Sequence, residues 1–212
     1  KVNEYATYSN KLLLNIMNNQ YITDLLVELV PVLTRRITQY HGLFSLPLIA
    51  EQWEETLHRS LVEIGRETTW KADRSHGIGE DMRLVGVDNS RISCKSGQFM
   101  NVRSLNKRCV KFNGSRSTSF ATLEEKIAHF SASHDDYYFL LAKEKKFDKQ
   151  YSLLVFPSDI CKVDKLSWTE SASKKSWNGD GEFSGVIGKS MSAQLWTSIP
   201  IDMIPHKIEI NI

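Results

Sequence analysis

The spacing of the apolar residues changes along the chain, and this change constrains the fold more than any other feature. Apolar residues recur at helical intervals over residues 8–40 and again over 48–64, where Trp53 and Leu57 share one face and Gly65 follows. One further helix is expected at 123–130. The remaining apolar residues form short runs typical of strands, at 82–87, 91–97, 107–112, 137–143 and 151–156. We therefore expect an α/β fold with a central mixed β-sheet flanked by helices.

The length of 212 residues suits one sizeable core, so we expect residues 1–212 to form a single domain. Three parts are expected within it: a helical N-terminal region (1–47), a core (48–160) and a loop-rich part (161–212). Pro31 should kink or restart the second N-terminal helix, because proline removes a helical hydrogen bond. Asn113 and Gly114 should form a turn. Long loops are expected over 164–188, which is rich in Ser, Lys, Trp and Gly, and closing strands over 193–212.

The net charge of +2 comes from 27 basic and 25 acidic residues, so total charge alone does not indicate a nucleic-acid partner. The basic residues are unevenly placed, however, and predict a local basic patch formed by Arg91, Lys95, Arg103, Lys107, Arg108, Lys111 and Arg116. Three cysteines without metal-ligand spacing indicate a reduced, cytoplasmic protein. We expect no membrane partner, because no apolar run approaches the roughly 20 residues of a membrane span.

A carboxylate and an ammonium group are expected to meet on one pair of strands. If the turn between 82–87 and 91–97 is centred on Asn89, Asp81 faces Gly97 and lies on the same side of the sheet as Ser93 and Lys95. Such a pair suits phosphodiester hydrolysis, in which a carboxylate holds Mg²⁺ against the phosphate while a cation steadies the attacking water. The carbonyl of Cys94 is a candidate second metal ligand. The structural alternative is a surface salt bridge worth less than about 1 kcal/mol.

The segment from His76 to Gln98 resembles the PD-(D/E)XK motif of restriction endonucleases, in which an Asp precedes an acidic residue, any residue and a Lys on the next strand. The expected order of elements over 48–160 is similar as well. Here Ser93 takes the acidic position, as in some restriction enzymes in which a helical Glu completes the metal site. The resemblance implies this role for Glu54 or Glu55, and Glu54 is the preferred candidate.

What the resemblance implies is a restriction-endonuclease-like core that cleaves double-stranded DNA with Mg²⁺. Asp81 and Glu54 would bind the ion, Lys95 would orient or activate water, and Ser93 would hydrogen-bond to this group. Because one such site cuts one strand, we expect a homodimer on a palindromic target, with the N-terminal helices at its interface. Two alternatives remain: a sequence-specific DNA-binding protein whose nuclease core no longer cleaves, which Ser93 favours, and a nuclease of DNA repair or junctions.

Several polar segments are candidates for DNA contacts. Ser115, Arg116 and Ser117 follow a strand and precede a helix, so they are placed to meet a phosphate, with a helix-capping turn as the alternative. His76, Ser96 and Gln98 flank the reactive pair. The candidates for base recognition, with an ordinary solvated loop as the alternative, are Lys174, Lys175, Asn178, Lys189, Ser190, Ser192 and Gln194.

Overall fold

The computed structural model describes residues 2–48, 50–70, 81–85, 90–117, 119–132, 136–145, 149–189 and 193–212; for residues 2–19, 50 and 115 it describes the backbone alone. The helices are α1 (Val2–Leu43), α2 (Ala50–Glu63) and α3 (Leu123–Ser131), with short 3-10 turns η1 (Ser158–Cys161), η2 (Val163–Lys165) and η3 (Ile201–Met203). The strands are β1 (Met82–Arg83), β2 (Arg91–Val102), β3 (Lys107–Arg116), β4 (Tyr137–Lys143), β5 (Tyr151–Pro157), β6 (Ser167–Glu170), β7 (Ser176–Asp180), β8 (Ser184–Gly188), β9 (Gln194–Pro200) and β10 (His206–Ile210).

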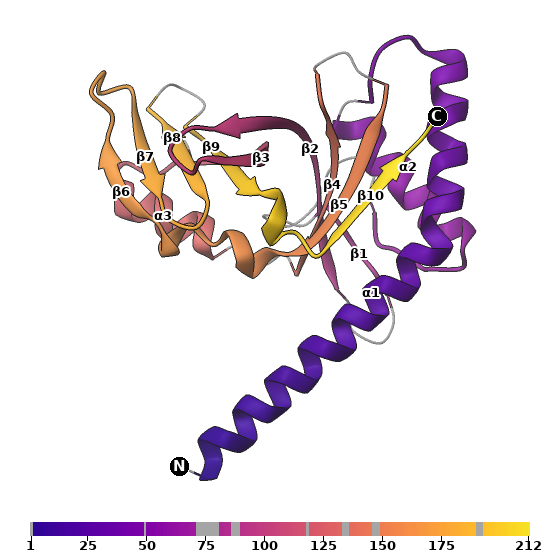
Figure 1. Ribbon diagram of the computed structural model, residues 1–212, viewed down its shortest axis with the longest axis horizontal. Helices are drawn as coiled ribbons and strands as arrows, with labels where there is room; N and C mark the ends of the chain where they lie inside the picture. Colours follow the sequence, from indigo (N-terminus) through magenta and orange to yellow (C-terminus); the bar gives the residue numbers. More distant parts are fainter. Residues whose placement is uncertain are drawn as a thin grey trace.

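These strands form one ten-stranded sheet in the order β10-β5-β4-β2-β3-β9-β8-β7-β6, with β1 paired to β2 beside this path (Figure 1). β2 and β4 are parallel and are connected through β3 and α3, whereas the other pairs are antiparallel. The expected α/β fold with a central mixed sheet is confirmed. None of the described helices is long and apolar enough to cross a membrane.

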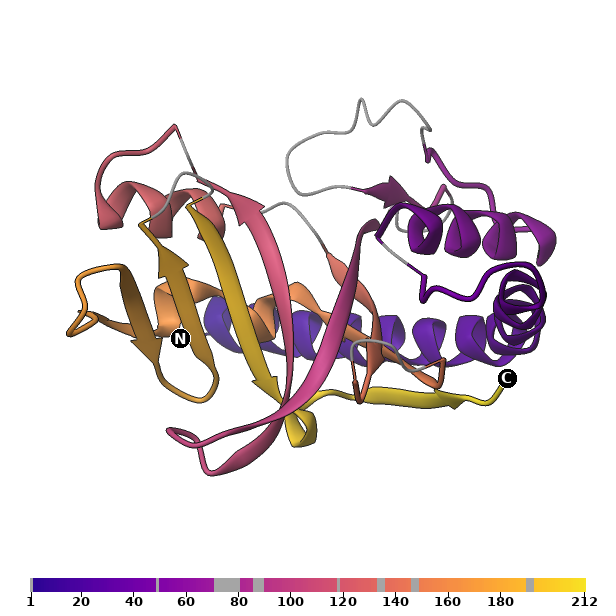
Figure 2. The ribbon, with the colours of Figure 1, turned by 90° about the horizontal axis from the view of Figure 1, so that it is seen from above.

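The sheet carries a separate apolar core on each face. Cys94, Phe139 and Leu153 point toward α1 and α2, whereas Leu140 and Leu154 point to the opposite core beside α3, because successive strand residues alternate between faces. Figure 2 shows α2 and the last part of α1 at one end of the molecule and α3 toward the other. The sheet is strongly curved: the rings of Phe112 on β3 and Phe156 on β5 lie 6.2 Å apart, although two strands separate them.

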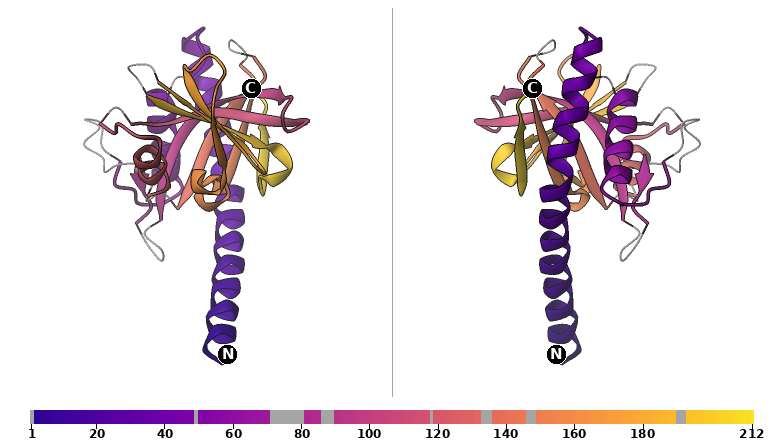
Figure 3. Two further views of the ribbon diagram at one scale, coloured as in Figure 1. Left: turned by 90° about the vertical axis from the view of Figure 1, so that its left-hand side faces the viewer. Right: turned by 90° about the vertical axis from the view of Figure 1, so that its right-hand side faces the viewer.

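The predicted restart of the helix at Pro31 is wrong, because α1 runs through this residue to Leu43. The alternative of a kink is compatible with Figure 1, in which α1 changes direction along its length. Pro31 lies on the solvent side of the helix, and exposed Val27, four residues earlier, can bond water through its carbonyl. Leu29 and Leu33 on the opposite side are fully buried, and this packing holds the helix together. Figure 3 shows the first part of α1 projecting from the rest of the molecule.

The second helix ends as the sequence predicts. Gly65 has a φ of 77°, and its N–H donates to the carbonyl of Val62 at 3.0 Å. The N–H of Arg66 donates to the carbonyl of Leu61 at 2.9 Å. These two bonds form a Schellman motif, which satisfies carbonyls left open at a helix end and favours glycine at the left-handed position.

Two predicted irregular segments are strands, and both corrections involve pairing with residues distant in sequence. Asn113 and Gly114 lie inside β3, where Asn113 pairs with Trp196 of β9 instead of forming a turn. The expected loops over 164–188 are wrong, because β6, β7 and β8 form an antiparallel meander. Gly179 allows Trp168 to lie flat on this meander: a Cβ at Gly179 would be 2.9 Å from the ring. The closing strands over 193–212 are confirmed as β9 and β10.

Candidate active site

Residues 93–96 of β2 lie between two strands that share one of its edges. β1 pairs with Arg91 and Ile92 on this edge, whereas β3 pairs with residues 97–102. Beyond the Gly97–Phe112 pair, β3 continues along β9 and leaves β2 (Figure 2). We call this region, residues 93–96 of β2 and 113–116 of β3, the fork. At residues 93–96, none of the described strands pairs with β2 on this edge.

The carboxylate of Asp81 takes the place of a strand partner at the fork. Its Oδ2 accepts hydrogen bonds from the Cys94 N–H at 2.6 Å, from the Lys95 Nζ at 2.9 Å and from the Ser93 Oγ at 3.2 Å. The Asp81 N–H donates in turn to the carbonyl of Ile92 at 3.0 Å. The carboxylate is therefore fixed by backbone and side chain together, which gives the Asp81–Lys95 pair a defined geometry.

The expected register of the two strands is wrong, but the expected meeting of side chains is confirmed. Met82 pairs with Ile92, which puts Asp81 opposite Ser93 and not opposite Gly97, a shift of four residues from 97 to 93. Only an odd shift moves a strand's side chains to the other face of a sheet, because side chains alternate with a period of two. Asp81 thus stays on the same face as Ser93 and Lys95.

The environment of the pair differs from that of a surface salt bridge. The side chains of Lys95 and Asp81 are 21% and 20% exposed, and Ser93 is fully buried. An ion pair of this kind is screened less by solvent than an exposed pair. The geometry therefore disfavours the alternative of an exposed surface salt bridge. Asp81 and Lys95 form a charged pair that is only partly accessible to solvent.

The backbone of Cys94 faces the fork, whereas its thiol does not. The N–H of Cys94 bonds to Asp81, and the carbonyl of the same residue points to the same edge of the strand. The side chain is buried in the core beneath α1 and α2. The predicted contribution of Cys94 to a metal site would therefore come from its carbonyl oxygen.

Helix α2 is fixed on the sheet next to this position. The indole N–H of Trp53 donates to the carbonyl of Phe139 at 3.1 Å, and Phe139 is the β4 partner of Cys94. Glu54 follows Trp53 and is partly buried. Glu55 is ion-paired with Arg59 and lines a pocket between α1 and α2. Glu54 therefore stays the preferred acidic candidate of α2, because Glu55 faces the other helix. Helix α2 packs on the face of β2 opposite to Asp81 and Lys95, so Glu54 would have to reach the ion at the edge of the sheet.

Sequence reasoning missed His58, one helical turn after Glu54. Its ring stacks on Trp70 with a centroid distance of 4.9 Å and hydrogen-bonds to Thr68, which forms a bridge with Leu84 beside β1. Burial is the main cause that lowers the pKa of His58, and the neighbouring charge of Arg59 lowers it further. His58 thereby connects α2 to the strand that follows Asp81. In the sequence, its position one helical turn after Glu54 could have identified it as a neighbour of that residue.

The described residues contain no group of three His, Cys, Asp or Glu side chains placed to share one metal ion. A Mg²⁺ site of one or two carboxylates with water and phosphate ligands does not require such a group. The buried hydroxyl of Ser96, at the fork, has no hydrogen-bond partner in the described part of the chain. The Asp81 carboxylate and the Cys94 carbonyl at one edge fit a hydrated cation, whereas the Ser96 side chain lies on the opposite face of β2 from Asp81 and Lys95. The carboxylate and the carbonyl do not form a closed protein cage.

The predicted phosphate contacts near residue 116 are only partly supported. Arg116 is exposed and lies opposite Gln194 across β3 and β9, so these two candidates are brought together. The prediction for Ser117 is wrong: its side chain is buried and donates to the carbonyl of Ala193 at 2.7 Å. Buried Lys126, which sequence reasoning missed, donates to the Ser117 carbonyl at 2.8 Å. These bonds join α3 to the ends of β3 and β9.

The other DNA candidates lie apart from one another. The amide of Gln98 donates to the Glu144 carbonyl at 3.3 Å. Lys174 and Lys175 are exposed at the turn between β6 and β7, whereas Asn178 lies within β7. Lys189 is ion-paired with Glu170 and lies 4.3 Å from the centroid of the Trp177 ring. His76, Ser190, Ser192 and the side chain of Ser115 fall outside the described residues.

Comparison with known proteins adds no family. The chain matches no family model, no curated protein and no solved structure. The geometry at the fork and the resemblance of the motif are therefore the features that indicate a function.

Proposed function

We propose that the chain is a Mg²⁺-dependent endonuclease that hydrolyses phosphodiester bonds of double-stranded DNA, with Asp81 and Lys95 at its reactive centre. One observation carries the proposal: the Asp81 Oδ2 lies 2.9 Å from the Lys95 Nζ where β1 and β3 leave the edge of β2 open among the described strands. A carboxylate and an ammonium group then face solvent together from a rigid strand. Phosphodiester hydrolysis requires both groups within reach of one phosphate.

The order of elements supports a core like that of PD-(D/E)XK restriction endonucleases. The chain runs through α2, β1, β2, β3, α3, β4 and β5, which is the succession of helix, three strands, helix and two strands expected from the sequence. Asp81 precedes β1 and Lys95 lies on β2, as the motif requires. We propose this family on the motif and the order of elements together.

Bound Mg²⁺ would polarise the scissile phosphate and lower the pKa of a bound water. Asp81 and the Cys94 carbonyl would hold the ion at the fork, with Glu54 as the acidic candidate from α2. Lys95 lies beside Asp81, where its ammonium group would orient the attacking water or neutralise developing negative charge. Ser93 holds the Asp81 carboxylate in position through its hydroxyl.

Ser93 also favours a second candidate function, a DNA-binding protein that does not cleave. The acidic position of the motif contributes a neutral hydroxyl that donates to Asp81, so it adds no negative charge toward a cation. A decayed site would keep the fold and the basic surface while losing metal affinity. This alternative predicts sequence-specific binding without any Mg²⁺-dependent cleavage.

The proposed enzyme acts as a homodimer on a palindromic site, so that two centres cut both strands. Its first helical part, residues 2–19, projects from the molecule and carries Leu12, Leu13 and Ile16 at helical spacing, which supports a role in self-association. The three cysteines are buried and form no disulfide in the described part of the chain, in keeping with the cytoplasm as the proposed location.

The test is incubation of the protein with supercoiled plasmid and Mg²⁺. Discrete linear fragments are expected, and Asp81→Ala and Lys95→Ala should each abolish cutting while DNA binding persists. Asp202→Ala and Lys107→Ala remove a comparable but exposed ion pair and should leave cutting unchanged. Intact plasmid with a gel shift would favour the non-cleaving protein, whereas nicks or cuts only at branched DNA would favour a repair or junction nuclease. Full activity of either site variant would refute the site.

A further inference from the structure

One face of the sheet is covered by helices over only half its width. The face that packs on α1 and α2 at β2, β4, β5 and β10 continues across β3, β9, β8 and β7 without a described helix above it (Figure 1). The opposite face of these strands is buried, with Phe112, Leu195 and Ile187 in the core beside α3. Trp196, on the uncovered face, is 40% exposed. A large aromatic side chain is thus open to solvent in the middle of the sheet.

Strand register assembles a group of polar side chains around Trp196. Lys111 and Asn113 lie on its face of β3, because Asn113 pairs with Trp196. The β-bulge between Asn113 and Arg116 inserts one residue, so Arg116 returns to the same face opposite Gln194. We call these five residues, Lys111, Asn113, Arg116, Gln194 and Trp196, the β3–β9 ladder. The ladder begins at the fork, one residue beyond the Gly97–Phe112 pair. It lies on the face of the sheet opposite to Asp81 and Lys95, because Lys111 pairs with Gln98 and side chains alternate along β2.

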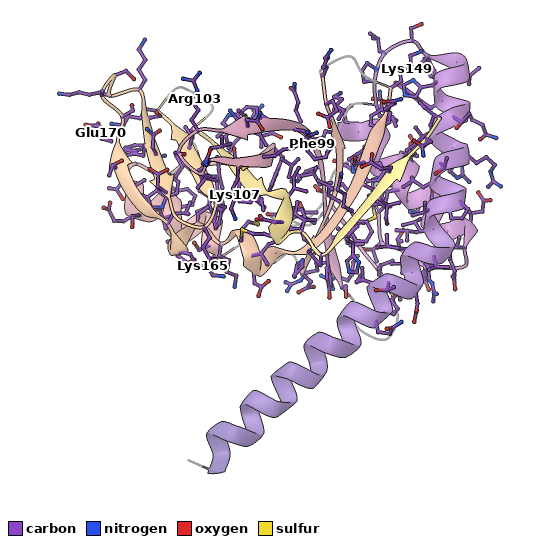
Figure 4. All side chains as sticks on the ribbon, viewed as in Figure 1. Phe99, Arg103, Lys107, Lys149, Lys165 and Glu170 are labelled. Carbon is purple, nitrogen blue, oxygen red and sulfur yellow. The ribbon has the colours of Figure 1, made fainter. Side chains whose placement is uncertain are left out.

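The charge of these strands is of one sign. β3, β8 and β9 contain four basic residues and no acidic residue. Arg108 is paired with Glu144, and Lys107, labelled in Figure 4, is paired with Asp202 at the far end of β3. The described carboxylates include no ion-pair partner of Lys111 or Arg116. The Lys111 Nζ instead lies 5.1 Å from the centroid of the Trp196 ring, which keeps the ammonium group above the uncovered face.

The chemistry and the width of the ladder both fit duplex DNA. Amides of Asn and Gln match the edge of adenine, and Arg or Lys matches the edge of guanine, in the major groove. Neighbouring strands lie about 4.8 Å apart, and the major groove is about 12 Å wide and admits a two-stranded ribbon. β3 and β9 fit this width. Asn178 on β7 lies three strand spacings from β3, roughly 14 Å, and so falls outside one groove.

We propose that the β3–β9 ladder reads base edges in the major groove of double-stranded DNA, and that Asn113 and Gln194 determine sequence specificity. This inference rests on the proposed function: the ladder would select the duplex, and a strand of its backbone would reach Asp81 and Lys95 around the open edge of β2 at the fork. It replaces the C-terminal loops as the reading surface. Lys111 and Arg116 supply affinity through phosphates or guanine, beside the two amides.

The experiment selects bound molecules from a library of DNA duplexes with a randomised 14-base-pair centre, in Ca²⁺ buffer, and sequences them. The full chain should enrich one short sequence. Asn113→Ala and Gln194→Ala should each relax one position of that sequence, by a factor on the order of ten to a hundred. Lys111→Ala should weaken binding to all duplexes and make it less dependent on salt. Asn178→Ala, an amide on the same face but beyond the groove, is the matched control.

Three results would overturn the proposal: no enriched sequence, an enriched sequence that Asn113→Ala and Gln194→Ala leave unchanged, or a preference for single-stranded DNA over the duplex. An unfolding midpoint equal to that of the unaltered protein shows that a variant is folded. Asp81→Asn should enrich the same sequence as the unaltered chain. If Asp81→Asn no longer cleaves DNA but still selects the same sequence, cleavage and base reading are separate properties. A failure of the ladder can then be distinguished from a failure of the nuclease site.

Discussion

The ion pair between Asp81 and Lys95 should be energetically coupled to a degree that exposed pairs are not. Asp81→Asn and Lys95→Met each remove one charge and keep most of the side-chain shape. The pair includes one charge-assisted hydrogen bond of 2.9 Å between side chains that are about four-fifths buried. Such bonds contribute roughly 1.5–3 kcal/mol, and the remaining exposure reduces this, so we expect a coupling of about 1–2 kcal/mol in a double-mutant cycle.

The assay is urea unfolding of the four proteins in the cycle, in EDTA so that no cation competes for the carboxylate. Lys107 and Asp202 form the matched control, at a similar N–O distance of 2.8 Å but with 47% and 63% of their side chains exposed. Their coupling should be about 0.5 kcal/mol and should fade in 0.5 M salt. A coupling for Asp81 and Lys95 that is no larger than the control, or equally sensitive to salt, would refute the geometry at the fork.

Three further perturbations test the fold. Gly179→Ala should lower the free energy of unfolding by about 1–3 kcal/mol, because its Cβ would lie 2.9 Å from Trp168, whereas Gly114→Ala meets its nearest atom at 3.4 Å and serves as the control in the same urea titration. Thr122→Ala should cost about 1 kcal/mol by removing the capping box of α3, and an unchanged midpoint would contradict that cap. Burial lowers the pKa of His206, so the unfolded chain binds its proton first and stability should fall as the pH drops below about 6.5. His206→Gln should flatten this part of the stability profile; an equal slope in both proteins would contradict the assignment.

The elements that the sequence predicts well are those specified by nearby residues. Helix α2 and its end at Gly65 follow from apolar spacing and from one residue suited to positive φ. α3 begins at a capping box in which Thr122 and Glu125 are three residues apart. The meeting of Asp81 with Lys95 was predictable despite the wrong register, because the alternation of side chains tolerates an even shift.

The features that the sequence did not predict depend on contacts between distant segments. Asn113 and Gly114 have the local preferences of a turn, but pairing with β9, more than 80 residues later, keeps them in a strand. In the meander of β6, β7 and β8, Trp168 packs against Gly179 and Gly185. From composition alone, these glycines predict a loop. Ser117 has the polarity of a DNA contact, yet it is buried by its bond to Ala193.

The central claim, that Asp81 and Lys95 form a nuclease centre, is tested most directly by single-turnover cleavage. The rate constant on a plasmid substrate, with saturating protein and Mg²⁺, would be compared for the unaltered chain, Asp81→Asn, Lys95→Met, Asp202→Asn and Lys107→Met. We expect the two site variants to be slower by a factor of about a thousand or more, equivalent to roughly 4 kcal/mol of transition-state stabilisation, and the two controls to be unchanged. Equal rates in all five proteins, or no cleavage by the unaltered chain, would contradict the claim.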